Sequence, residues 1–153
     1  MIKEQILSRL TAMCSRSEHC LSDVRRKMDL WGVGDEQLRR EVCDYLVSER
    51  YIDEARYARF FINDKMKYNR WGKRKVEQAL RMKQVPREVY APLLADIADD
   101  DCEAILLPLL RSKSKSVKAS SPYEHRMKLV RFALSRGFSF DQASNCLDAL
   151  GME

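Results

Sequence analysis

The sequence predicts an all-α protein, an elongated array of three tandem three-helix modules that each resemble a helix-turn-helix unit. Three observations predict this fold class. A faint repeat recurs three times at a spacing of 52 to 53 residues. Within each copy, the apolar spacing is that of two amphipathic helices joined by a short turn. The chain also has only four prolines, and no run of alternating β-branched residues indicates a strand.

Six apolar positions carry each copy of the repeat. In the first copy they are Val24, Met28, Val33, Leu38, Val42 and Tyr45. In the second copy they are Val76, Leu80, Val85, Tyr90, Leu94 and Ile97. In the third copy they are Leu129, Ala133, Phe138, Ala143, Leu147 and Leu150. Helix pairs in units of about fifty residues are typical of arrays whose modules complete their cores against neighbours. We therefore predict modules at 1–49, 50–98 and 99–153, presenting a long surface for a long partner.

The first module is expected to hold three helices. Apolar residues from Ile6 to Met13 predict a helix over 3–14, and the polar residues at 15–17 end it. Ser17 is a candidate cap for a second helix from Glu18 to about Leu30, because serine caps helix N-termini well. Glycines at 32 and 34 end that helix. A third helix begins at Asp35, and its apolar face consists of Leu38, Val42, Tyr45 and Leu46.

The second module repeats this pattern. A long helix is predicted from 53–54 to about Tyr68, followed by a break at 69–72 and a helix over 73–83. The next helix is expected to run to about Ile97, with Pro86 in its first turn. Proline is tolerated there because the backbone N–H that it lacks would have no hydrogen-bond partner within the helix.

The third module begins with a predicted helix over 102–111, interrupted or started late at Pro108. The Ser/Lys-rich segment 112–121 is expected to be a flexible connection. A helix then runs over 122–136 until Gly137 ends it, and the last helix covers 140–150. The prediction is therefore about nine helices in three sets of three.

Charge is distributed in blocks along this chain, whose net charge is +5 and whose pI is about 9.0. Residues 65–83 and 111–131 are basic, and residues 86–104 between them are acidic. Alternating blocks create a field with a direction, which can orient a charged partner as well as attract one. The basic block at 65–83 contains Tyr68 and Trp71, a composition that can hold phosphates and stack on bases. Trp71 can equally be a core residue between modules.

Several classes of protein are not indicated. The first residues mix apolar and charged side chains, unlike a secretory signal, and no apolar run is long enough to span a bilayer, so we expect a cytoplasmic protein without membrane contact. The five cysteines are irregularly spaced and are expected to be reduced and buried. Paired zinc ligands, phosphate loops and nucleophile elbows are missing, so we expect no metal, no cofactor and no enzymatic activity.

The helix-turn-helix pattern itself allows two interpretations. A module can insert a recognition helix into the major groove of DNA, or it can simply close a small core. The helices at 35–48 and 87–97, which would have to read the groove, are acidic or mixed in charge. This composition disfavours a mode of action like that of a transcription factor.

One stretch of the second module resembles the RecX family, the bacterial regulatory proteins of the RecA recombinase. The matching residues are Tyr51, Ile52, Asp53, Tyr57, Ala58, Gly72, Lys75, Leu80 and Lys83. Their order and spacing, together with the triple repeat and the chain length, extend the resemblance to the whole chain. Two residues depart from the family pattern, since Arg50 and Gln84 stand where glycine is usual. A left-handed turn costs a residue other than glycine about 1 kcal/mol.

The resemblance implies a modulator that binds in the helical groove of the RecA filament on single-stranded DNA. Members of the family are usually inhibitors. Such proteins restrain filament growth, strand exchange, ATP hydrolysis and cleavage of the SOS repressor. We expect a monomer that contacts RecA, and single-stranded DNA directly or through RecA. Charge clustering selects the expected contacts, which are Arg70, Lys73, Arg74, Lys75, Arg81, Lys83, Lys113, Lys115, Lys118, Arg126 and Lys128. The alternatives are a stand-alone nucleic-acid-binding helical module and an adaptor for another acidic protein.

Overall fold

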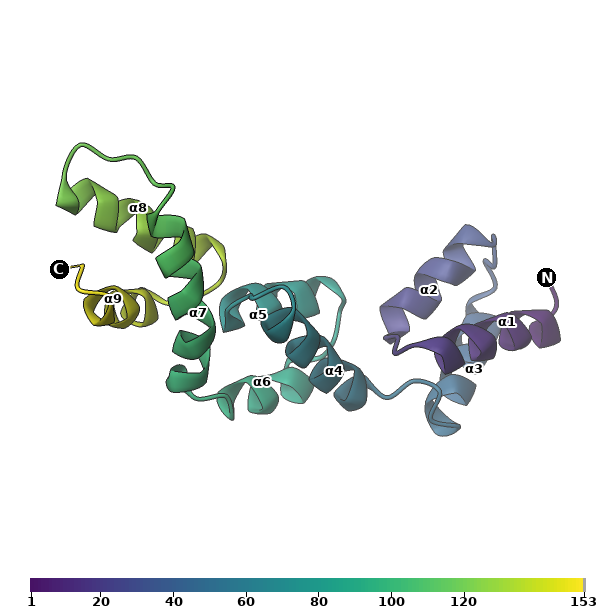
Figure 1. The fold of residues 1–153 in the computed structure, drawn as a ribbon. Coiled ribbons are helices and arrows are strands. Elements are labelled where there is room, and N and C mark those ends of the chain that lie inside the picture. The colour runs from purple at the N-terminus through teal and green to yellow at the C-terminus, as the bar shows by residue number, and fades with distance from the viewer. Residues whose placement is uncertain (153) are drawn as a thin grey trace. The chain divides into compact units, whose positions relative to one another are not determined.

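The computed structural model describes residues 1–152, and over this range the chain forms nine α-helices and no strand (Figure 1). The predicted all-α class and the predicted number of helices are confirmed. The helices are α1 (Lys3–Arg16), α2 (Leu21–Leu30), α3 (Glu36–Ser48), α4 (Glu54–Lys67), α5 (Lys73–Met82), α6 (Arg87–Ala95), α7 (Asp99–Ser114), α8 (Pro122–Ser135) and α9 (Phe140–Ala149).

The boundary between α1 and α2 differs from the prediction. Helix α1 continues to Arg16, and Ser17 is its C-cap instead of the N-cap of α2. Helix α2 begins at Leu21, with Cys20 as the N-cap residue. The backbone amide of Cys20 donates to the Asp23 carboxylate at 3.3 Å, so the first turn is capped by a side chain inside the helix. The hydroxyl of Ser17 lies 2.9 Å from Nε2 of His19 instead.

Helix α7 is longer than predicted at both ends. It begins at Asp99, and all three aspartates at 99–101 lie in its first turn, where the helix dipole favours negative charge. Pro108 lies inside the helix and does not interrupt it. Leu106 and Leu110 on either side of the proline are completely buried, and this burial outweighs the one backbone hydrogen bond that a proline removes. The helix also includes the first three residues of the segment predicted to be a flexible connection.

The repeat is visible in the way that α2, α5 and α8 end. The carbonyl oxygens of Met28, Leu80 and Ala133 each accept a hydrogen bond from the amide five residues later, at 2.9, 3.1 and 3.1 Å. The residue directly before the donor has a left-handed backbone in every copy, with φ of 72° at Gly32, 60° at Gln84 and 97° at Gly137. This is the Schellman arrangement that satisfies the last carbonyls of a helix. Arg50, which follows α3, is also left-handed, with φ of 60°.

Most of the apolar repeat positions are buried, as predicted. Leu38, Ile97 and Leu150 are half-buried, and Tyr45, which was placed on the apolar face of its helix, is exposed. Its side chain is 40% exposed, and its ring stacks at 6.4 Å on the ring of Tyr51. The prediction for Tyr45 was therefore wrong, whereas Leu46, which was predicted on the same face, lies in the core.

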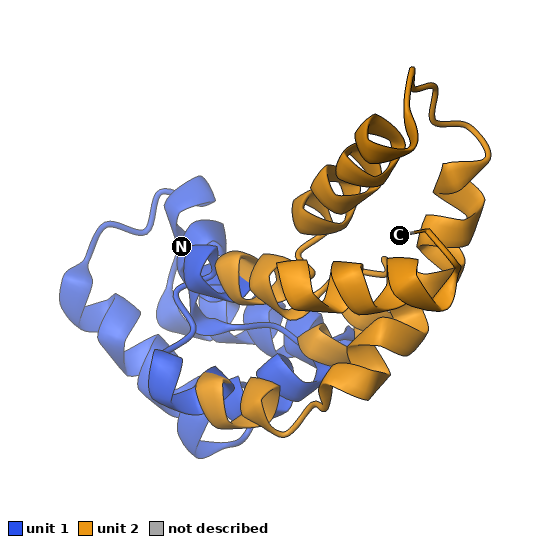
Figure 2. Cartoon of the chain, turned by 90° about the vertical axis from the view of Figure 1, so that its left-hand side faces the viewer, with its two compact units in different colours: residues 1–60, 80–90 blue, residues 61–79, 91–153 orange. Residues whose placement is uncertain are grey.

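The chain divides into two compact units (Figure 2). The first unit contains residues 1–60 and 80–90, and the second contains residues 61–79 and 91–153. The boundary passes through α4, α5 and α6, so each of these helices contributes to both units. The division into modules at 1–49, 50–98 and 99–153 remains a prediction from the repeat.

Each unit has its own apolar core. In the first unit, the core residues are Ile6, Leu10, Val24, Met28, Val33, Val42, Cys43, Leu46 and Ile52. In the second unit, α7 packs against α8 and α9, and completely buried residues include Leu106, Leu110, Leu129, Phe138 and Leu147. The buried amide of Gln142 donates to the Asp99 carboxylate at 2.9 Å, which ties α9 to the start of α7.

Candidate anion-binding interface

Two glycines of the second unit hold two helix connections together. The amide of Gly72, between α4 and α5, donates to the carbonyl of Arg136 at 2.8 Å. The amide of Arg74 donates to the carbonyl of Gly137 at 3.1 Å. A Cβ atom on Gly72 would lie 2.4 Å from the backbone of Gly137, and one on Gly137 would lie 2.5 Å from Cβ of Lys75. Only glycine allows the two backbones to approach this closely.

Trp71 precedes the first of these glycines and carries two cations. The ammonium groups of Lys65 and Lys75 lie 5.4 and 4.8 Å from the centre of its ring. The amide of Trp71 donates to the carbonyl of Lys65 at 3.1 Å, which fixes the backbone beneath the ring. Each such cation–π contact contributes about 0.5–1 kcal/mol at exposed sites. Trp71 is half-buried, and its ring positions the two lysines.

Phe132 forms a matching arrangement on α8. The ammonium of Lys113 and the guanidinium of Arg136 lie 5.2 and 5.6 Å from its ring centre. Arg136 is also the residue whose carbonyl accepts the hydrogen bond from Gly72. The two cation-bearing rings are therefore linked through one backbone contact. We call this set the basic–aromatic junction, and its members are Lys65, Trp71, Gly72, Lys75, Lys113, Phe132, Arg136 and Gly137.

The sequence pattern had singled out Lys75 and Lys113 separately, and in the structure Lys75 lies over the ring of Trp71 and Lys113 over the ring of Phe132. Phe132 and Arg136 were missed as site residues. A signal for them was present in the sequence, because Arg136 follows Phe132 by four residues at the end of a predicted helix and precedes a helix-ending glycine. The contact between Gly72 and Gly137 has no signal in the sequence, since nothing local pairs two turns 65 residues apart.

Further cations surround the segment between α4 and α5. Arg70 and Arg74 are exposed, and neither forms an ion pair with another of the residues 1–152. Lys67 is exposed as well, and its ammonium lies 5.4 Å from the ring of Tyr68. The carboxylate of Asp64 lies 4.0 Å from the Lys65 ammonium. Most of the positive charge here therefore has no compensating carboxylate.

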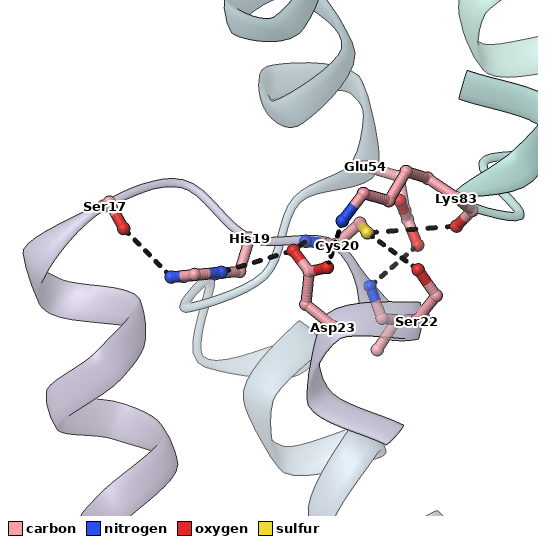
Figure 3. A network of polar contacts seen from close by, with 8 residues as sticks. Ser17, His19, Cys20, Ser22, Asp23, Glu54 and Lys83 are labelled. Atoms are coloured by element: carbon pink, nitrogen blue, oxygen red, sulfur yellow. Dashed lines mark hydrogen bonds and ion pairs between the residues drawn. The ribbon is translucent and has the colours of Figure 1, made fainter. Parts of the chain in front are cut away.

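Other predicted contact residues are engaged within the chain. The ammonium of Lys73 donates to the carbonyl of Ile97. In the first unit, the ammonium of Lys83 lies 2.7 Å from the Asp23 carboxylate, which also accepts from His19 Nδ1 at 3.2 Å (Figure 3). Arg81 is exposed on α5. Because Asp23 compensates its charge, Lys83 contributes less to any external field than the sequence suggested.

Asp23 has a shifted pKa as a result of these contacts. Burial alone would raise the pKa of this carboxyl group, but hydrogen bonds from Lys83, from the Cys20 amide and from His19 outweigh burial and lower it below its ordinary value of 3.8. Figure 3 shows the carboxylate between His19 and Lys83, which reach it from opposite sides. The network joins the start of α2 to the C-terminal end of α5.

The predicted residues of the third module separate into two groups. Arg126 pairs with Asp148 at 3.2 Å and also donates to the hydroxyl of Ser144. Lys128 pairs with Glu124 at 3.1 Å and donates to the carbonyl of Lys118. Lys115 and Lys118 are exposed in the segment after α7. Arg126 and Lys128 lie in the first half of α8, whereas the junction uses its last turns.

Two further features of the described chain bear on possible activities. No helix within residues 1–152 is long and apolar enough to cross a membrane. Across the same residues, no three or more histidine, cysteine, aspartate or glutamate side chains gather in a way that could hold a metal ion.

Comparisons with known proteins identify the family. Residues 53–91 match the model of the second three-helix domain of RecX, and residues 99–147 match that of the third. The regulatory protein RecX of Vibrio parahaemolyticus is 30% identical over 135 residues, covering 88% of this chain and 84% of that protein. The regulatory protein RecX of Clostridium botulinum is 30% identical over 120 residues, and the match spans 77% of this chain but 55% of the relative.

A solved structure supports the same fold. The crystal structure of RecX from Lactobacillus salivarius superposes with a TM-score of 0.85 over 99% of this chain and 97% of that one, at 16% sequence identity. A likeness at this identity shows the fold alone. The matches to the family models and the identity to curated relatives show the family, and this chain belongs to the RecX family.

Proposed function

We propose that this chain regulates the RecA recombinase by binding in the groove of the RecA filament on single-stranded DNA. Binding there limits filament growth, ATP hydrolysis and cleavage of the SOS repressor. Family membership supports the partner, because the relatives are regulatory proteins of the RecX family. The proposed role is that of a binding protein, and it requires no catalytic step by this chain.

The observation that carries the proposal is the uncompensated positive charge at the start of α5. Its first turn consists of Lys73, Arg74 and Lys75 and has no acidic residue. Cations are unfavourable at a helix N-terminus, by about 0.3–1 kcal/mol each when exposed, because they face the positive end of the helix dipole. The helix therefore forms against this repulsion, and an anionic partner would relieve it.

The basic–aromatic junction adds a second source of affinity. Its cations rest on aromatic rings, and Lys65 also lies 4.0 Å from the Asp64 carboxylate. The rings restrict the positions of the cations while most of their charge stays available to a partner. A groove lined by acidic side chains and DNA phosphates is complementary to such a surface. Charge complementarity of this kind steers the encounter and fixes the orientation of the partner.

The first test is the RecA ATPase on single-stranded DNA, with this chain added at a substoichiometric ratio to RecA. Inhibition by few molecules per filament is the expected result. Arg74→Glu is the sharpest variant, because Arg74 is exposed and forms no ion pair within residues 1–152. Arg87→Glu is the matched control, since it changes the net charge equally at an exposed helix start outside the junction.

We expect Arg74→Glu to raise the inhibitory concentration at least tenfold and Arg87→Glu to leave it nearly unchanged. Reversing Lys73, Arg74 and Lys75 together is expected to abolish filament binding. Equal inhibition by all variants would remove the α5 surface from the mechanism. No inhibition by the wild-type chain, together with salt-sensitive binding to bare DNA, would favour the alternative of a stand-alone nucleic-acid-binding module.

A further inference from the structure

The segment that leads from α4 into α5 contains one aromatic ring that is largely exposed to solvent. Tyr68 is 71% exposed although the ammonium of Lys67 lies 5.4 Å from its ring centre, whereas the rings of Trp71 and Phe132 each carry two cations. The amide of Tyr68 donates to the carbonyl of Asp64 at 2.9 Å, so the backbone of this residue continues the helix and is fixed. The ring is therefore presented to solvent from an ordered support.

The charges next to this ring suit a phosphate backbone. Arg70 lies two residues after Tyr68 and Arg74 six residues after it, both exposed. Arg70 has a left-handed backbone with φ of 56°. A glycine at this position would avoid about 1 kcal/mol of backbone strain. The arginine at this position is therefore not explained by the stability of the turn, and its side chain is free to contact a partner.

The backbone of this segment is fixed at both ends and offers few amides of its own. Trp71 donates to Lys65, Gly72 to Arg136, and Arg74 to Gly137. A phosphate held here must therefore be contacted by side chains. Fixing the segment in advance lowers the entropy that binding costs, which favours a small but specific contact.

We propose that Tyr68 stacks on an unpaired base of single-stranded nucleic acid while Arg70 and Arg74 hold the adjoining phosphates. The inference deepens the proposed function and rests on it for its setting in the filament. Single strands are favoured over duplex because only an unpaired base exposes its face to a ring. Aromatic stacking of this kind tolerates any base, so little sequence preference is expected.

The experiment measures binding of this chain of 153 residues to fluorescently labelled oligothymidine, and to a hairpin duplex, by anisotropy without RecA. Tyr68→Ala is expected to weaken oligothymidine binding about tenfold and leave duplex binding unchanged, since stacking contributes on the order of 1–3 kcal/mol per base. Tyr68→Phe keeps the ring and is expected to bind as the wild type does. Because Tyr68 has no charge, the salt dependence should stay the same in both variants.

Arg74→Gln provides the contrasting readout. It removes one phosphate contact, so the slope of log affinity against log salt should fall by about one. The stacking proposal is overturned if Tyr68→Ala binds oligothymidine as tightly as the wild type, if it weakens single-strand and duplex binding equally, or if the wild-type chain does not bind oligothymidine.

The ATPase assay separates this inference from the proposed function. Inhibition of RecA by a wild-type chain that fails to bind oligothymidine would preserve the regulatory function and overturn the stacking site. Ring-dependent binding to oligothymidine without any effect on RecA would preserve the stacking site and overturn the regulatory function.

Discussion

Gly72 and Gly137 approach each other so closely that a Cβ atom on the first would lie 2.4 Å from the carbonyl of the second. The atoms that a Cβ on either glycine would meet are backbone atoms and the Cβ of Lys75, and none of them can move aside by a side-chain rotation. The junction therefore depends on the absence of two side chains. The cations on Trp71 and Phe132 depend on the same contact for their relative placement.

Gly72→Ala is expected to destabilise the chain by about 2–3 kcal/mol, because the added methyl group forces the two backbones apart. Urea unfolding followed by circular dichroism measures the change. Gly34→Ala is the control, since Gly34 has no atom within 4 Å of the added Cβ. Similar losses in the two variants would show that the close contact does not determine stability.

Gln84→Gly is expected to stabilise the chain by about 1 kcal/mol, because Gln84 has a left-handed backbone that glycine adopts without strain. The reciprocal change, Gly32→Gln, places glutamine at the equivalent turn of the first copy, where φ is 72°, and should cost a similar amount. Thermal unfolding of the two variants checks both signs. A Gln84→Gly variant that is less stable than the wild type would contradict the strain argument.

Asp23→Asn is expected to lower stability by about 1 kcal/mol at neutral pH, because the pair with Lys83 is only partly exposed. The pKa of Asp23 is lower in the folded chain than its ordinary 3.8, so its contribution is present above that value. The contribution disappears as the pH falls through the lowered pKa, where the wild-type carboxyl also becomes neutral.

Urea unfolding of wild type and Asp23→Asn between pH 2 and pH 7 tests this dependence. The difference between them should be constant above about pH 5 and shrink below pH 4. Asp44→Asn on the exposed face of α3 serves as control. A difference that stays constant down to pH 2 would show that the ionised form of Asp23 is not what stabilises the network.

The cysteine side chains are expected to react slowly in the native protein. Four of the five are buried, and burial raises the pKa of Cys14 and of Cys146 to about 11. Because the thiolate is the reactive form, a colorimetric thiol reagent at pH 8 should titrate at most one group rapidly, and all five in denaturant. Rapid reaction of three or more thiols without denaturant would disagree with the buried positions.

Much of the fold could be predicted from the sequence because it is local. Apolar spacing located the helices, and the glycines at 32 and 137 marked two of the three equivalent helix ends. The predicted start of α2 was wrong because Ser17 does not cap this helix. The carboxylate of Asp23, which lies in the first turn, accepts the hydrogen bond from the amide of Cys20 instead. Helix α7 was predicted too short because the burial of Leu106 and Leu110 outweighs the local preference of Pro108.

The candidate site could be predicted in composition but not in arrangement. Basic residues 70–75 and Lys113 were identified, because charge blocks are visible along the chain. Which cations can contact a partner depends on whether their long side chains reach a carboxylate elsewhere in the fold. Lys83 reaches a carboxylate on α2, whereas Lys75 rests on a ring four residues before it. The contact between Lys83 and Asp23 and the contact between Gly72 and Gly137 join residues that are far apart in the sequence, so local sequence patterns do not predict them.

The division of the chain into units that are interleaved in sequence has a consequence for its synthesis. The apolar cluster of the first unit ends at Ile52, so it can close early as the chain leaves the ribosome. The rest of that unit must wait for residues 80–90. By then residues 61–79, which belong to the other unit, have emerged without most of their partners. During synthesis, residues 61–79 therefore lack most of their packing contacts for a time and are accessible to chaperones and proteases.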